Sequence, residues 1–145
     1  MRQELLLLTG NIIHLSQLIE HNLRLMIFLD TRLDQKDRKP NKDEESAEEL
    51  FVSIQKWSLG DLIDLAKDYN VLSVADIKYL KTVTPKRNRI AHSFFKDAYL
   101  NGRFEKYGEE QKMYIELQEI ELEFHNLHEN ILKIIAKLEQ QGARK

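Results

Sequence analysis

The chain has 145 residues, of which 42% are hydrophobic and 32% charged, and its formal net charge is −2. This length suits one domain with a real hydrophobic core, whereas 5 Gly and 2 Pro are too few turn residues for a many-stranded β fold. No Cys is present, which excludes disulfides and thiolate metal sites and fits a reducing cytoplasm. A net negative charge argues against an extended surface for duplex DNA. It leaves open a local basic patch, and the densest candidate contains Lys81, Lys86, Arg87 and Arg89.

An apolar stripe predicts a long helix at the start of the chain. Its members alternate in steps of three and four, and they are Leu5, Leu8, Ile12, Leu15, Ile19, Asn22, Met26 and Leu29. Further apolar residues (Leu6, Ile13, Leu18, Leu23 and Leu25) widen this surface, so we expect the helix at the centre of a bundle or in a subunit interface. Polar residues interrupt the stripe throughout and no small-residue cleavage site follows. We therefore predict neither a signal peptide nor a membrane span.

The middle of the chain predicts a polar loop followed by shorter helices. Residues 34–49 contain almost no apolar side chains and are expected to form a solvated, flexible loop that leads into a short helix around Leu50–Trp57. Ser58 and Ser73 are placed to cap two further helices. The first of these would carry Leu59, Leu62, Ile63 and Ala66.

A proline then interrupts the helical pattern. Thr84-Pro85 has the composition of an N-cap followed by a first helical residue, so we expect a helix to restart there and run to about Phe95. Asn101-Gly102 is a turn signal, and either a small hairpin or a plain loop would fit it.

A second long stripe predicts the last helix. Its members are Met113, Leu117, Ile120, Phe124, Leu127, Ile131, Ile134 and Leu138. We therefore predict an all-α fold in which residues 1–145 form a single domain. The architecture would be a bundle of four to five helices, with long antiparallel first and last helices packed together.

Residues 87–92, Arg-Asn-Arg-Ile-Ala-His, are the segment that suggests chemistry. On a helix, Ile90 and Phe94 share a face that should meet the core, with Ala91 beside them. Asn88 and His92 are four residues apart and would stack on another face within reach of each other. Arg87 would lie between the two faces.

This combination of side chains suits the cleavage of RNA. An imidazole titrates near neutral pH, a guanidinium holds phosphate bidentately, and an amide can orient the imidazole or bind substrate. RNA supplies its own nucleophile, the 2′-OH, so neither a metal nor another cofactor is predicted. Because one helix offers one imidazole, two copies of the site facing each other would supply both an acid and a base. The alternative is that Arg87 and His92 are near one another by chance and have surface or capping roles.

The segment RNRIAHSFF resembles the signature of the HEPN superfamily, in which Arg, usually followed by Asn, precedes His by four to six intervening residues. Here Arg87, Asn88 and His92 match it, and SLGDLI at 58–63 is similar to a stretch found in many members. The resemblance spans roughly residues 5–135.

This resemblance implies a HEPN-like helical bundle and a homodimer with apposed motifs. It also implies metal-independent endoribonuclease activity, with Arg87, Asn88 and His92 as catalytic residues. Such proteins often act as toxins of toxin–antitoxin pairs or in phage defence, so RNA is the expected substrate and an antitoxin or a nucleotidyltransferase-type protein an expected partner. Toxin members frequently carry Tyr where this chain has Phe94. Some members have lost catalysis, which leaves a second hypothesis: a non-catalytic module that binds nucleotide, RNA or a partner protein.

Several other residues have two interpretations each. Lys86, Arg89 and Phe95 are predicted to contact RNA, although core packing is an equal alternative for Phe95. Trp57 and Phe94 could also stack on bases, but core packing is favoured for both. The remaining histidines form no cluster with ligand spacing, so no metal site is predicted at His14, His21, His125 or His128. For Asn22 a hydrogen-bonded core amide is favoured over a bond across a dimer interface or towards the motif.

Overall fold

The computed structural model describes residues 1–37, 45–69 and 72–143, and within these ranges it has six helices and no strand. The helices are α1 (Arg2–Asp37), α2 (Ala47–Ser53), α3 (Leu59–Ala66), α4 (Val74–His92), α5 (Phe94–Leu100) and α6 (Glu109–Ala143). The all-α prediction is confirmed for this part of the chain, although the helices number six and not four or five. None of the described helices combines the length and hydropathy that a bilayer crossing requires.

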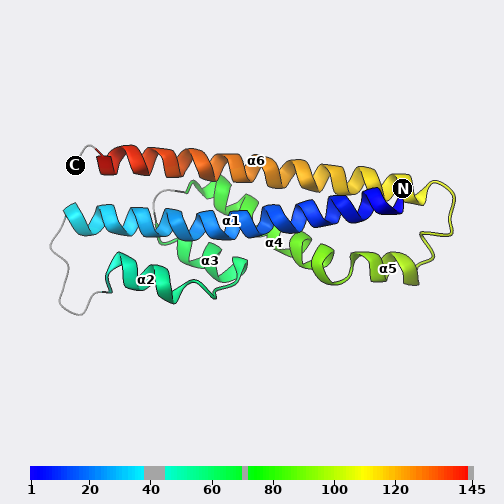
Figure 1. Ribbon diagram of the computed structural model, residues 1–145, viewed down its shortest axis with the longest axis horizontal. Helices are drawn as coiled ribbons and strands as arrows, with labels where there is room; N and C mark the ends of the chain where they lie inside the picture. The colour runs from blue at the N-terminus through cyan, green and yellow to red at the C-terminus, as the bar shows by residue number, and fades with distance from the viewer. Residues whose placement is uncertain (38–44, 70–71, 144–145) are drawn as a thin grey trace.

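The two long helices α1 and α6 lie side by side and run in the same direction (Figure 1). Their side-chain contacts advance together along both helices. Arg2 bonds to Glu110, Asn11 to Glu121 and Asn22 to His128. The predicted antiparallel arrangement is therefore wrong. A short connection would have forced it, but residues 38–108 are long enough to return along the 36-residue α1, which spans about 54 Å.

The apolar stripes of α1 and α6 form most of the core, as their spacing predicts. Leu5, Ile12, Ile19 and Met26 are fully buried in α1, and Phe124 is fully buried in α6. The widened apolar surface of α1 has two outcomes: Leu23 is buried, whereas Leu6 remains 59% exposed. One face of α1 near its start is thus apolar and uncovered in the single chain.

Side-chain caps begin the three helices that follow. Ser46 and Ser58 accept hydrogen bonds from backbone N–H groups three residues ahead, and Ser73 forms a complete capping box with Asp76. All four apolar residues predicted for α3 are buried. The predicted loop at 34–49 is shorter than expected, because residues 34–37 belong to α1 and 47–49 to α2; its part at 38–44 lies outside the described residues. Trp57 is 38% exposed, so its predicted core position is wrong.

Helix α4 continues through Pro85 without a restart, contrary to the prediction. Pro85 cannot donate to the carbonyl of Lys81, but Val83 on one side of it and Ile90 on the other are both buried against the bundle. This packing outweighs the local preference for a break. The helix ends at His92, and Ser93 separates it from α5. The predicted turn follows α5 as a plain loop, with Gly102 at φ 66°.

Candidate functional site

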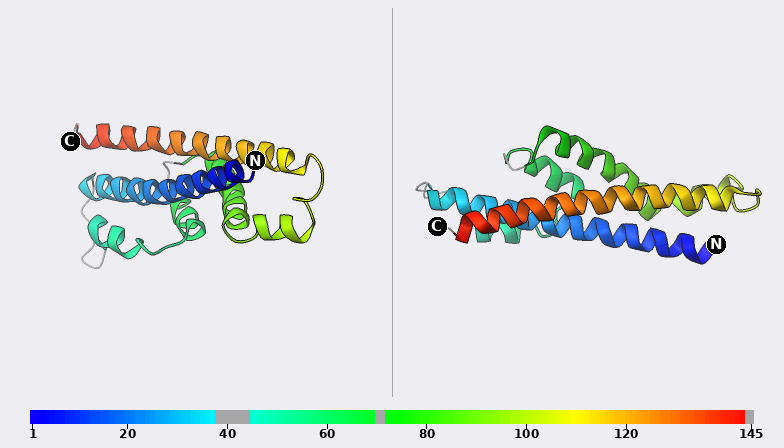
Figure 2. Two further views of the ribbon diagram at one scale, coloured as in Figure 1. Left: turned by 45° about the vertical axis from the view of Figure 1, so that its right-hand side comes forward. Right: turned by 90° about the horizontal axis from the view of Figure 1, so that it is seen from above.

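The segment of interest occupies the end of α4. This helix crosses behind the α1–α6 pair and leads directly into α5 (Figures 1 and 2). It packs on α1, α3 and α6, and near its C-terminal end Lys86 and Arg89 pair with glutamates of α6. Arg87, Asn88 and His92 therefore lie on a supported helix, not on a loop.

One stripe of α4 passes from the core to the surface. Leu80, Thr84, Arg87 and Ala91 follow one another at steps of four, three and four. Leu80 is fully buried, Thr84 and Arg87 are half-buried, and Ala91 is exposed. Ala91 was predicted to lie beside the core, and its exposure shows that this prediction is wrong. Ile90 and Phe94 are buried, as predicted. Arg87 thus lies at the boundary between core and solvent.

The Arg87 guanidinium has an amide partner and no acidic one among the described residues. Its Nη1 donates to Asn88 Oδ1 at 3.2 Å. Its Nε is buried and makes no hydrogen bond. A half-buried cation without a counter-ion is unusual in a folded chain, because burial weakens its hydration and one neutral amide replaces only part of it. The arrangement is suited to an anion supplied from outside.

His92 is exposed at the last turn of α4 and makes no hydrogen bond or ion pair with any residue that the structure describes. At 3.6 residues per turn it is rotated about 140° from Arg87 around the helix, and Asn88 lies between them. Asn88 is the residue to which the Arg87 guanidinium bonds, so the three side chains of the motif occupy neighbouring positions around the helix. The predicted Asn88–His92 pair is adjacent in register, but no hydrogen bond joins the two side chains.

Lys86 and Arg89, the basic residues on either side of Arg87 and Asn88, each form an ion pair with a glutamate of α6. Lys86 Nζ lies 2.6 Å from Glu123 Oε2, and Arg89 Nη1 lies 2.6 Å from Glu116 Oε1. Arg89 also stacks on the Phe94 ring, with its guanidinium carbon 5.1 Å from the ring centroid. Their predicted contacts with RNA stay predictions, but each would compete with an existing ion pair.

Sequence reasoning missed these acidic partners. Glu116 and Glu123 are seven residues apart and so lie on one side of α6, just as Lys86 and Arg89 lie on one side of α4. The pairing order is reversed, with the earlier base on the later acid, because α4 runs against α6 at this crossing. Two bases on one side of α4 and two acids on one side of α6 were the available signal, although the bases are three residues apart and the acids seven.

The predicted base-contacting aromatic, Phe95, is half-buried. It meets Phe94 edge to face at 5.4 Å and stacks on Phe104 at 6.2 Å between ring centroids. This ring cluster joins α5 to the loop before α6. Arg103 strengthens the same junction by bonding Glu109 at 3.0 Å and approaching Glu116 at 3.7 Å.

Asn22 has an internal partner, so the favoured interpretation of a satisfied core amide is confirmed. Its Nδ2 lies 2.8 Å from His128 Nε2, the geometry of an amide donating to a neutral imidazole. Burial lowers the pKa of His128, with the positive field of His125 acting in the same direction and Glu129 opposing it. Among the described residues no three His, Asp or Glu side chains are grouped to hold a metal ion.

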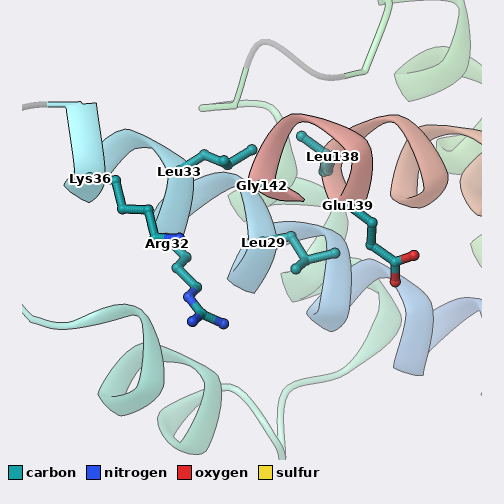
Figure 3. A pocket seen from close by; sticks show the side chains of 7 residues that line it. All are labelled: Leu29, Arg32, Leu33, Lys36, Leu138, Glu139 and Gly142. Atoms are coloured by element: carbon teal, nitrogen blue, oxygen red, sulfur yellow. The ribbon is translucent and has the colours of Figure 1, made fainter. Parts of the chain in front are cut away.

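One pocket lies at the other end of the molecule, between the last turns of α1 and α6 (Figure 3). Its volume is about 230 Å³, below the range of about 300–1,000 Å³ typical of ligand sites. The lining residues are Leu29, Arg32, Leu33, Lys36, Leu138, Glu139 and Gly142. None of the residues of the α4 segment contributes to it, so it does not form part of the candidate site.

No protein-family model, curated protein or solved structure matches the chain. The residues of α4 and the resemblance of their motif are therefore what point to a function.

Proposed function

We propose that the protein is a metal-independent endoribonuclease of the HEPN type, with Arg87, Asn88 and His92 at its catalytic centre. The observation that carries the proposal is the half-buried Arg87 guanidinium, which has no acidic partner among the described residues and bonds to Asn88, on the same end of α4 as the exposed imidazole of His92. A backbone phosphate of RNA is an anion of the right geometry for a guanidinium fork.

In the proposed reaction the 2′-OH of one nucleotide attacks the adjacent phosphorus, and the bond from phosphorus to the 5′-oxygen of the next nucleotide breaks. His92 in its neutral form accepts the proton of the 2′-OH, and a protonated imidazole delivers a proton to the leaving 5′-oxygen. The products are a 2′,3′-cyclic phosphate and a 5′-hydroxyl. Arg87 stabilises the charge that develops on the non-bridging oxygens.

A homodimer supplies the second imidazole in this proposal. Two-fold symmetry would place the motif of each chain opposite its copy, so that one His92 acts as base and the other as acid. The exposed apolar face of α1 supports an interface of this kind, because Leu6 is 59% and Leu7 68% exposed beside Gly10. In a toxin–antitoxin or phage-defence setting, RNA would be the substrate and a second protein would hold the enzyme inactive.

The second candidate function is a non-catalytic HEPN module that binds nucleotide, RNA or a protein. The ion pairs of Lys86 and Arg89 favour it to the extent that they leave few cations for a long RNA. Binding without cleavage would need Arg87 but would not need His92.

Cleavage of a mixed-sequence RNA by purified dimer separates the two functions. We expect His92→Ala to reduce the rate by at least about 100-fold, the usual contribution of a general acid or base. The matched control is His125→Ala, which removes an exposed imidazole from α6 and should leave the rate unchanged. If the wild-type chain cleaves no faster than His92→Ala, the enzyme proposal is wrong and the binding module remains.

A further inference from the structure

Thr84 stands out among the hydroxyl side chains of the protein. Every other Ser or Thr makes a hydrogen bond: some cap a helix, and others bond to a carbonyl one turn earlier or to a tyrosine. Thr82, only two residues away on the same helix, donates to the Tyr79 carbonyl at 2.7 Å. The Thr84 hydroxyl is buried and has no partner among the residues that the structure describes, although Pro85 leaves the carbonyl of Lys81, one turn earlier, without its usual N–H.

The second buried side-chain atom without a partner in the described residues is Arg87 Nε. Unpaired buried polar atoms are rare and costly, so finding two within one helical turn calls for a common explanation. The two atoms are complementary, because Nε–H is a donor and a hydroxyl oxygen accepts.

Helix geometry brings these two groups together. Residues three apart lie on one side of a helix, and side chains tilt towards the N-terminus, so the Arg87 side chain extends back over Thr84. Around the helix, Thr84 is placed between Arg87 and Asn88, about 60° from the first and 40° from the second. The Arg87 guanidinium bonds to Asn88 through Nη1, which leaves Nε, the nitrogen nearer the backbone, on the stretch of side chain that lies beside Thr84.

We infer that Thr84 is a positioning residue for Arg87: when a phosphodiester binds, Arg87 Nε–H is donated to Thr84 Oγ1, and the two terminal nitrogens are directed at the phosphate. Phosphate oxygens compete for the Nη1 donor that now bonds Asn88 and draw the guanidinium outward. A small rotation of the guanidinium then pairs both unsatisfied atoms at once. Thr84 does not touch the substrate, and the inference rests on the proposed role of Arg87 as the phosphate ligand.

The test compares Thr84→Val, which keeps the branched shape and removes the acceptor, with Thr84→Ser, which keeps the hydroxyl. The first measurement is the ¹⁵N–¹H resonance of Arg87 Nε–H, assigned by its loss in Arg87→Lys. The probes are inorganic phosphate and a 2′-O-methyl RNA, which cannot be cleaved. We expect either probe to shift this resonance and slow its exchange with water in the wild-type and Thr84→Ser proteins, and to do neither in Thr84→Val.

The second measurement is RNA cleavage. We expect kcat to fall about tenfold in Thr84→Val with KM changed less than twofold, since orientation of the guanidinium matters most in the transition state. Thr84→Ser should recover most of the rate. If Thr84→Val does not fold, Thr84→Ala replaces it with the same expected results.

The two proposals fail in different ways. An Arg87 resonance that responds to phosphate equally in the wild-type and Thr84→Val proteins overturns the role of Thr84, whatever the activity. The Arg87 resonance could respond to phosphate only in the wild-type and Thr84→Ser proteins while neither cleaves RNA. That result would support the positioning role of Thr84 and contradict the ribonuclease proposal. If the Arg87 resonance responds to phosphate in none of the proteins, Arg87 is not a phosphate ligand and the positioning role of Thr84 is wrong as well.

Discussion

Replacing Glu116 by Gln should change how the protein holds RNA. Glu116 is the counter-ion of Arg89, at 2.6 Å, and also lies 3.7 Å from Arg103. Removal of its charge leaves Arg103 with Glu109 and leaves Arg89 without an acidic partner. The freed guanidinium belongs to a side chain that is 44% exposed, so it becomes available to a second phosphate of a bound strand.

The magnitude follows from counterion release. Each phosphate neutralised on a single strand contributes about 0.7 to the slope of log K against log salt. One freed Arg89 should therefore steepen the slope by about 0.7 per chain in contact with RNA. Between 50 and 200 mM salt, that increment is an additional loss of affinity of about 2.6-fold. At the lower salt concentration the variant should bind more tightly than the wild-type chain.

Fluorescence anisotropy with a labelled 2′-O-methyl RNA, titrated at several NaCl concentrations, measures this slope. The matched control is Glu119→Gln, which removes one negative charge from an exposed position of α6 that has no ion pair within the described ranges. If both variants steepen the slope equally, the effect comes from net charge and the local reasoning is refuted. An unchanged slope in Glu116→Gln would show that Arg89 does not reach RNA even when it is freed.

Four further outcomes are expected. In mixtures with excess His92→Ala chains, activity should fall faster than the wild-type fraction if both imidazoles of a dimer are needed, and a strictly proportional loss would show that each chain works alone. Cleavage should survive excess chelator and leave a 2′,3′-cyclic phosphate, whereas loss with chelator and recovery with magnesium would contradict the mechanism. Because burial lowers the pKa of His128, the unfolded chain takes up this proton first as the pH falls, so the free energy of unfolding should decrease below about pH 6.5. Urea unfolding at pH 7.5 and 5.5 tests this, and a decrease that persists undiminished in His128→Gln would point to other groups. Phe124→Ala should lower stability by about 3–5 kcal/mol, or about 10–16 °C in Tm, while Leu122→Ala, on the exposed side of α6, should cost less than about 0.5 kcal/mol; similar losses would refute the assigned register.

Helix positions and core faces could be predicted well because both depend on local chemistry. The stripes of α1 and α6 follow the 3.6-residue period, and burial of that stripe is the main source of helix stability. The capping serines could be placed because their hydroxyls satisfy N–H groups only three residues ahead. In each case the deciding interaction lies within a few residues of sequence.

The errors concern interactions that connect distant segments. The direction of α6 relative to α1 depends on the connection through residues 38–108. The spacing of apolar residues within each helix does not predict it. Continuation of α4 through Pro85 depends on packing of Val83 and Ile90 against other helices, and this packing overrides the local preference. Exposure of Trp57 and Ala91 reflects the same limit, since a residue type favours burial only where another element arrives to cover it.

At the candidate site the residues could be predicted from the sequence, but which of them have a counter-ion could not. The motif identifies three side chains in the sequence. Only the packing of α4 on α6 reveals that Lys86 and Arg89 have acidic partners, whereas Arg87 has none among the described residues. A fully buried Arg87 would require a carboxylate beside it, and a fully exposed one would be hydrated and loosely held. At the boundary where the stripe of α4 leaves the core, the guanidinium is neither. In the proposed function, the ion pairs on either side would act indirectly: they hold α4 against α6, and so they hold Arg87, which has no acidic partner among the described residues, in place for an incoming anion.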